Sequence, residues 1–202
     1  MNLNAIKTLC FGGKHATIYN YMWGSGQWIS NGFAAYPVEG VRIEDANALM
    51  DLWNLSDKAR SKAVIIPETT SDRRFTRGYF EGEEELKELG ATAFGDEAIY
   101  IALQSHKGVL WINADFLKPL RGDYRLYYAR WEGGRPLVAV YEDMTDCKAL
   151  ILPAGNIMAD MLRRHAEQMR AEPFHWLDDE DEAAEAEADA EAKFTDNAPG
   201  AD

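Results

Sequence analysis

The chain has 202 residues, of which 47% are hydrophobic and 11% aromatic, and its formal net charge is −13. This length suffices for one domain of about 150 residues, which buries roughly 70% of its unfolded surface without disulfides or metals. The charge is unevenly placed. Residues 171–202 hold twelve acidic side chains and one lysine, a net charge of −11, whereas the preceding 170 residues have a net charge of −2. The composition therefore predicts a nearly neutral domain followed by an acidic segment, with little positive charge for neutralising phosphates.

The N-terminal sequence has no charged region followed by an apolar run, so we expect no signal peptide. Cys10 and Cys147 are the two cysteines, and we expect both to be reduced thiols in a cytoplasmic protein. No stretch approaches 18 uninterrupted apolar residues, so we expect no membrane span.

The first elements are less distinct than the later ones. Residues 1–12 fit the start of an amphipathic helix, Gly12-Gly13 breaks it, and Thr17–Tyr21 is typical of a strand. The Gly-Gly-Lys-His run lacks the spacing of a phosphate-binding loop, so a turn is the better interpretation. Residues 27–36 predict either a strand pair or one long strand with a bulge at Gly32.

A helix is predicted over Glu44–Leu55, because its leucines and Trp53 gather on one broad face and its acids lie towards the N-terminal half. A charged loop over Asp57–Lys62 and a strand over Ala63–Ile66 follow, and Pro67 is expected to close that strand.

The most basic stretch of the chain is Thr69–Gly78, in which three arginines surround Phe75: Arg73, Arg74 and Arg77. An aromatic ring among arginines could stack on a base while the guanidinium groups hold phosphates. A solvated loop neutralised by the acids at 81–85 is the favoured interpretation. Glu83–Leu89 then fits a short acidic helix or an ordered insertion.

A strand at Ile99–Leu103, a turn at 106–108 and a strand at Val109–Ile112 follow. Asn113 is a suitable N-cap for a two-turn helix with the apolar residues Phe116, Leu117 and Leu120, which Gly122 ends. Three further strands are predicted over residues 124–131, 137–141 and 149–152, separated by turn residues.

Beyond Pro153 we expect a helix from Asn156 to about Arg170 with a methionine-rich stripe that includes Met158 and Met161. Such a stripe fits a partner surface, although packing on the domain is the commoner role. An aromatic cluster containing Phe174 and Trp176 precedes an acidic segment that should be disordered. We thus expect a domain at 1–153, a helix with an aromatic cluster at 154–177 and a tail at 178–202.

Known catalytic and metal-binding motifs are missing from the sequence. The four histidines are scattered, without the spacing of zinc ligands, and no Gly-x-Ser-x-Gly nucleophile motif is present. We therefore expect no cofactor or metal, and a non-enzymatic protein is favoured over an enzyme whose site is assembled only in space.

Four segments resemble the sliding clamps of bacterial replicative polymerases, the beta subunits: Trp28–Tyr36, Val41–Leu49, Trp111–Leu120 and Leu150–Pro153. The first two resemble a clamp strand with a polar pair and the strand-to-helix step after it. The last two resemble the strand, short helix and closing apolar strand of a clamp domain. The resemblance implies an α+β fold, an antiparallel sheet with two short helices in (βαβββ)2 order.

The resemblance also implies a function in DNA replication or repair through a replication protein as partner, in a protein of phage or mobile-element type. A clamp ring would make the chain a homo-oligomer. Weak DNA contact would then fall to the cations near the second helix and in the basic stretch: Lys118, Arg121, Arg73, Arg74 and Arg77. Partner contact would fall to the closing strand and the segment after it: Leu152, Pro153, Met158, Met161, Phe174 and Trp176. The alternative is an acidic DNA-mimic regulator whose tail binds basic protein surfaces.

Overall fold

The computed structural model describes residues 2–12, 15–23, 26–80, 83–95, 98–131 and 134–155. The chain divides into two units, Met1–Ile157 and Met158–Asp202. All described residues belong to the first unit. The predicted helix after Asn156, the aromatic cluster and the acidic tail therefore lie outside the described residues.

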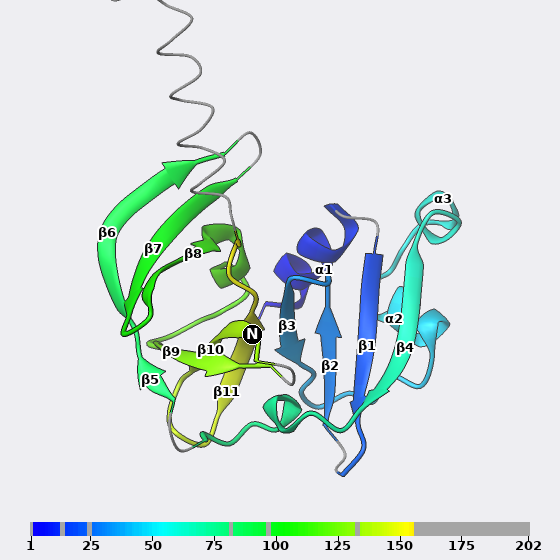
Figure 1. The fold of residues 1–202 in the computed structure, drawn as a ribbon. Coiled ribbons are helices and arrows are strands. Elements are labelled where there is room, and N and C mark those ends of the chain that lie inside the picture. Colours follow the sequence, from blue (N-terminus) through cyan, green and yellow to red (C-terminus); the bar gives the residue numbers. More distant parts are fainter. Residues whose placement is uncertain are drawn as a thin grey trace, which may run out of the picture. The chain divides into compact units, whose positions relative to one another are not determined.

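The first unit is a mixed α+β structure made mostly of strands (Figure 1). Its helices are short: α1 Leu3–Gly12, α2 Ala46–Leu52, α3 Asp57–Arg60 and the 3-10 turns η1 Arg73–Phe75 and η2 Ala114–Leu117. Its strands are β1 His15–Tyr21, β2 Gln27–Ser30, β3 Ala34–Pro37, β4 Val64–Thr70, β5 Glu84–Glu85, β6 Lys87–Phe94, β7 Ile99–Ser105, β8 Gly108–Asn113, β9 Arg125–Arg130, β10 Pro136–Tyr141 and β11 Cys147–Ile151. They form an eight-stranded sheet in the order β4-β1-β2-β3-β11-β10-β9-β5 and a three-stranded sheet in the order β6-β7-β8.

The eight-stranded sheet contains two similar halves. In one half α1 precedes the antiparallel strands β1, β2 and β3, and in the other η2 precedes the antiparallel strands β9, β10 and β11. The halves join where β3 and β11 pair antiparallel, with Ala35 opposite Leu150 and Ala34 opposite Ile151. We call this pairing the seam. The N–H of Leu152 extends it by donating to the carbonyl of Phe33 at 2.7 Å.

One face of this sheet, here called the helix face, carries α1, α2 and η2. Successive strand residues point to opposite faces, and Ile29, Val138 and Ile151 are buried on this face with residues from the helices and from the three-stranded sheet. The halves also touch here, because the Tyr36 hydroxyl donates to the carbonyl of Phe116 at 2.7 Å. In the two halves, η2 and α1 occupy corresponding places. The predicted helix over Glu44–Leu55 does not take that place, and it is shorter than predicted, forming α2.

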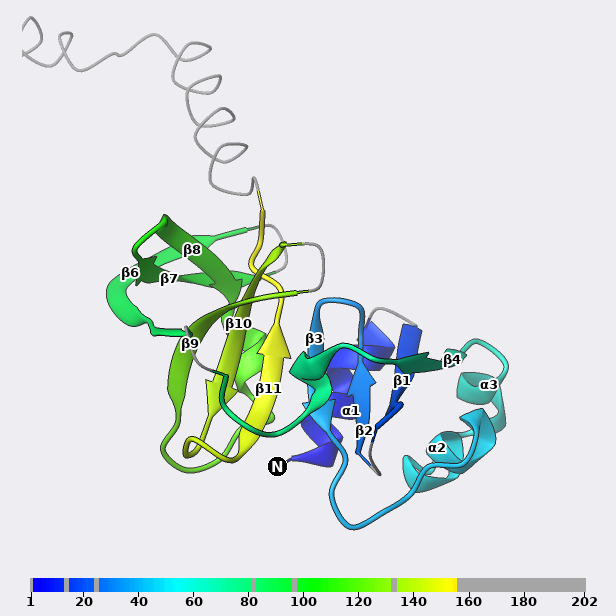
Figure 2. The same cartoon turned by 60° about the horizontal axis from the view of Figure 1, so that its bottom comes forward.

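The opposite face is covered by residues 71–80, here called the strap, which run from β4 at one edge towards β5 at the other (Figures 1 and 2). Phe75 is the buried anchor of the strap, with its ring centroid 4.7 Å from that of Tyr19, 5.6 Å from Trp28 and 5.2 Å from Trp131. The indole N–H of Trp28 also donates to the carbonyl of Phe75 at 2.7 Å. We call this side of the sheet the strap face.

The strap is also tied to the loop between β10 and β11. The N–H of Cys147 donates to the carbonyl of Arg77, and the N–H of Tyr79 to the carbonyl of Met144, both at 2.8 Å. The guanidinium of Arg77 forms ion pairs with Asp146 and with Glu39. These contacts hold the strap against the loop between β10 and β11 and against Glu39, which follows β3.

Both edges of the eight-stranded sheet are poor templates for a further strand. In β4 the carbonyl of Thr70 accepts from Met22 on the β1 side at 2.8 Å. Because backbone groups alternate in direction along a strand, Pro67 faces outwards and offers no N–H donor at the middle of the free edge. At the other edge, β5 has two residues. Short edge strands and edge prolines hinder association between sheets.

The strands predicted at 99–103, 109–112, 124–131, 137–141 and 149–152 are confirmed within one or two residues as β7 to β11. The alternative of a strand pair over residues 27–36 is also confirmed, as β2 and β3. Four other predictions are wrong, in whole or in one of their alternatives.

The predicted two-turn helix after Asn113 is one 3-10 turn, because Pro119 lacks the N–H that would continue an α-helix.

Of the three remaining errors, one is local and two arise where strand pairing overrides local composition. Residues 57–60 form the short helix α3 within the predicted loop, with Ser56 as its N-cap. β4 continues through Pro67, which an edge strand tolerates. Of the two alternatives for residues 83–89, the short acidic helix is wrong. These residues are rich in helix formers, yet pairing with β9 and β7 makes Glu84–Glu85 strand β5 and Lys87–Leu89 part of β6.

Replacing Phe75 with alanine should lower the free energy of unfolding by about 3–5 kcal/mol, because the substitution leaves a cavity under the strap. Urea unfolding followed by tryptophan fluorescence measures this loss. Ser71→Ala, an exposed change in the same strap, is the matched control and should stay within about 0.5 kcal/mol of the wild type. Equal effects of the two changes would mean that Phe75 is no anchor.

Tyr36→Phe should cost about 1–3 kcal/mol, because it leaves the buried carbonyl of Phe116 without its donor. Chemical denaturation again measures the change. Tyr100→Phe is the control, since the Tyr100 hydroxyl makes no hydrogen bond within the described residues. A neutral Tyr36→Phe would show that this contact does not help to hold the two halves together.

Candidate functional site

A pocket of about 220 Å³ lies at one end of the seam. It receives residues from both halves of the sheet and from the turns beside it. They are Tyr19, Ser30, Gly32, Phe33, Ala34, Ala35, Trp131, Arg135, Leu137, Leu150 and Leu152. The pocket is mainly apolar, with one charged side chain, Arg135, in its lining.

The turn between β2 and β3 presents Phe33 at the mouth of the pocket. The side-chain oxygen of Asn31 accepts from the N–H of Phe33 at 3.0 Å and from that of Ala34 at 2.8 Å. Gly32 supplies the positive φ of 88° that this tight turn needs. The turn leaves Phe33 63% exposed, although it is one of the large apolar residues of the chain.

The opposite wall comes from the hairpin between β9 and β10. Trp131 is half-buried, and its ring lies edge-on to Phe75 at an interplanar angle of 89°. The backbone N–H of Trp131 donates to the backbone carbonyl of Arg135 at 2.9 Å, and both residues line the pocket. Trp131 is thus held by the strap anchor while one side of it remains available to the pocket.

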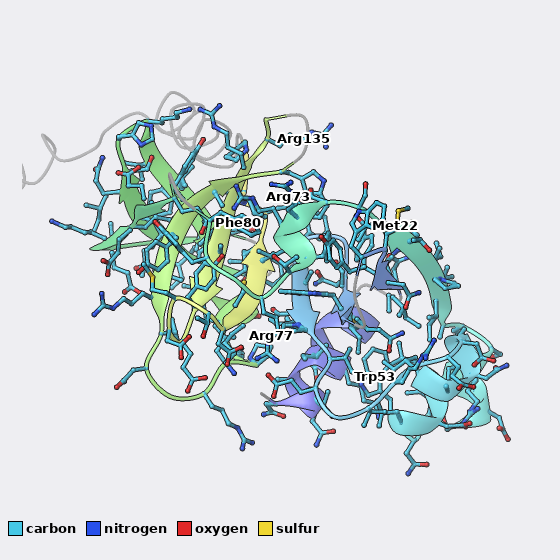
Figure 3. All side chains as sticks on the ribbon, turned by 90° about the horizontal axis from the view of Figure 1, so that it is seen from below. Met22, Trp53, Arg73, Arg77, Phe80 and Arg135 are labelled. Atoms are coloured by element: carbon cyan, nitrogen blue, oxygen red, sulfur yellow. The ribbon has the colours of Figure 1, made fainter. Side chains whose placement is uncertain are left out.

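Two exposed arginines lie on this side of the molecule: Arg135, which lines the pocket, and Arg73 in the strap. Neither forms an ion pair with another residue of the described segments. We call them the rim arginines. Figure 3 shows Arg73 and Arg135 towards the same side of the molecule, with Arg77 well apart from them. Burial raises the pKa of Tyr19 in the pocket wall, and the negative charge of Glu68 adds to this rise. The rim is therefore locally positive in a chain that is acidic as a whole.

The predicted basic cluster does not act as a unit, because two of its arginines serve the strap. Arg74 pairs with the buried Glu83 and lies over the ring of Phe80 at 4.6 Å. Burial raises the pKa of Glu83 even though Arg74 opposes this shift. Phe75 is buried and offers no face to a base. Of this cluster, Arg73 is the arginine without an ion pair to a described residue.

Arg77 belongs to a charge network with Lys148. Burial raises the pKa of Glu39, but hydrogen bonds and charges from Arg77 and Lys148 outweigh it and hold that pKa below its usual range. Lys148 also pairs with Glu142 at 3.0 Å and with Asp146 at 2.6 Å. These cations are neutralised locally and leave little charge for a polyanion.

Lys118 and Arg121 follow η2, which packs on the helix face, whereas the strap arginines cover the opposite face. Lys118 pairs with Asp115 at 2.6 Å. The five predicted DNA-facing residues therefore do not share one surface.

Of the predicted partner-binding residues, Leu152 lines the pocket and Pro153 follows it, half-buried. Met158, Met161, Phe174 and Trp176 lie outside the described residues. Sequence reasoning missed Tyr19, Phe33, Trp131 and Arg135. A large apolar residue directly after a tight turn, as in Asn31-Gly32-Phe33, was the available indication.

Both cysteines are buried, on opposite faces of the sheet. Burial raises the pKa of the Cys10 thiol to about 12, and it does the same for Cys147. Over residues 2–155 with their gaps, no three His, Cys, Asp or Glu side chains are grouped to hold a metal ion. In the same segments no helix has the length and apolar character needed to cross a bilayer.

Comparisons with protein-family models, with curated proteins and with solved structures found no match. The site must therefore be interpreted from its own geometry.

The two thiols should resist labelling in the folded protein. A rise in pKa from 9.0 to about 12 lowers the thiolate fraction at neutral pH by about a thousandfold, and the thiolate is the nucleophile. We expect negligible reaction with a disulfide reagent in buffer and reaction of both thiols in denaturant. Rapid labelling of native protein, reported by absorbance and by mass of the intact chain, would contradict the buried positions of Cys10 and Cys147.

Proposed function

We propose that this protein is a non-enzymatic domain of sliding-clamp type that acts in DNA replication or repair through contacts with other proteins. The observation that carries the proposal is the doubled arrangement in which a short helix precedes three antiparallel strands on each side of the seam. This arrangement agrees with the resemblance of residues 111–120 and 150–153 to a clamp domain. The strand before η2, β8, belongs to the three-stranded sheet, and no described strand precedes α1.

A docking role is favoured over a ring that encircles DNA. Further pairing at the sheet edges is hindered by Pro67 in β4 and by the two-residue length of β5. On the helix face, the ammonium of Lys7 is held by the carbonyl of Trp53 at 2.6 Å, and Lys118 is paired with Asp115. Few phosphates would be neutralised, so DNA affinity at physiological salt would be low.

A second candidate function rests on the charge distribution. Residues 171–202 have a net charge of −11 from twelve acidic side chains and one lysine. An acidic segment of this kind suits a DNA mimic that competes for basic protein surfaces. A full-length variant with the tail acids changed to their amides discriminates the two. Loss of all partner binding would support the tail, and retained binding supports the domain.

The test is the mass of the full chain in solution, measured by light scattering with and without duplex DNA. We expect the mass of one chain in both cases. We also expect a DNA-independent increase in mass with at least one of a purified bacterial clamp, clamp loader or replicative polymerase.

Two results would contradict the proposal. The first is no mass change with any of the three replication proteins. The second is tight DNA binding that weakens steeply with salt. A plot of the logarithm of the binding constant against the logarithm of the salt concentration would then have a slope of about −0.9 for each phosphate contacted.

A further inference from the structure

We infer that the pocket at the end of the seam receives a peptide of a partner protein in which one large apolar side chain is flanked by carboxylates. This inference rests on the proposed function, since it names the partner chemistry of the docking domain. It is carried by the floor of the pocket, its exposed ring and its unpaired rim arginines.

The floor of the pocket favours an apolar anchor of limited size. Leu137 and Leu150 are buried in the strap-face cluster, and Leu152 packs beside them. Ala35 carries a small side chain on this face at the seam, which leaves the space open. The volume of about 220 Å³ is below the range of about 300–1,000 Å³ that holds a cofactor or drug-sized molecule. The space therefore suits one side chain.

The mouth of the pocket favours an aromatic or branched aliphatic anchor. Phe33 is 63% exposed, and its backbone is fixed by hydrogen bonds to Asn31, so little conformational entropy is lost when a partner covers it. Trp131 stands on the other side, fixed by Phe75. An aromatic anchor between two such rings gains contact energy beyond its buried area.

The two rim arginines are the reason for expecting carboxylates on the peptide. The guanidinium groups of Arg73 and Arg135 form no ion pairs within the described segments, in contrast to Arg74 and Arg77. Arginine binds carboxylates through two parallel hydrogen bonds, which gives orientation as well as affinity. The negative charge of Glu68 acts on Tyr19 in the pocket wall, so the carboxylates should lie towards the Trp131 side.

A peptide fits better than a single-stranded nucleic acid. Nucleic acids of this kind are held by several stacking rings in series and by a continuous track of positive charge. Here Phe33 is the strongly exposed ring of the lining, and the first 170 residues have a net charge of −2. One apolar anchor and one or two carboxylates match the pocket and its two rim arginines.

The experiment is fluorescence anisotropy on the full chain with a labelled peptide in which one phenylalanine is followed by a run of glutamates. We expect saturable binding that disappears when alanine replaces the phenylalanine and weakens when glutamines replace the glutamates. Phe33→Ala and Arg135→Gln in the protein should each weaken binding by about tenfold, which is the loss typical of an interface anchor.

Arg121→Gln is the matched control, because it also removes an exposed arginine without an ion pair to a described residue, but near η2 and away from the pocket. It should leave the affinity within about twofold, as distant surface changes do. Both pocket positions are exposed, so their urea midpoints should match the wild type, and this measurement separates lost binding from lost folding.

Several results would overturn the inference. They are no binding of the peptide, equal weakening by Arg121→Gln, or a thymidine oligonucleotide that binds the pocket more tightly than the peptide. A concentration-dependent dimer that Phe33→Ala abolishes would make a second copy the occupant, and this too would overturn it. If peptide binding fails while a clamp, loader or polymerase still binds, the pocket is excluded and the proposed function stands. If the peptide binds but no replication protein does, the proposed function fails and the pocket stands.

Discussion

The structure depends most on the short pairing between β3 and β11. Ala35 with Leu150 and Ala34 with Ile151 join two four-stranded halves into one sheet, and the bond from Leu152 to Phe33 extends the pairing by one step. So short a ladder would be weak alone. It is supported on the helix face by the bond from Tyr36 to Phe116, and the N–H of Asn2 donates to the carbonyl of Pro119 at 2.8 Å.

The alternation of side chains along the strands gives the sheet two different faces. On the helix face, three helices and the small sheet bury residues such as Ile29 and Val138, while the strap face is covered by one ten-residue segment anchored at Phe75. That lighter cover leaves the end of the seam open between Phe33 and Trp131. The pocket is thus a consequence of how the second face is closed, and any ligand in it touches both halves of the sheet.

The arginines on the strap face also fall into two groups, according to whether they hold the strap in place. Arginines within the strap are neutralised by Glu83, Glu39 and Asp146 because they hold the strap in place. Arg73, at the margin of the strap, forms no ion pair within the described segments. This difference separates Arg73 from Arg74 and Arg77, which are indistinguishable in the sequence.

The sequence was sufficient to place those strands whose pattern of apolar residues matches their burial in the sheet. β7 to β11 alternate or are continuously apolar, and their positions were predicted within two residues. Composition alone did not predict β5, because strand pairing overrides the helix preference of its glutamates. It also did not predict how short η2 is, because the missing N–H of Pro119 ends that helix after one turn. Leu152 was predicted as a partner residue from its place in the closing strand, but the pocket itself was not. Tyr19, Phe33 and Trp131 are far apart in the chain, and only the seam and the strap bring them together.

The central claim is that the two halves meet at β3 and β11 and that ligand contact at the end of this seam is felt across it. Hydrogen exchange of the backbone amides, measured with and without the acidic phenylalanine peptide, tests this most directly. The account predicts slower exchange at Leu152 and at residues of both β3 and β10 when the peptide is bound, with α1 unchanged. Protection confined to one half of the sheet, or found only on the helix face, would contradict it.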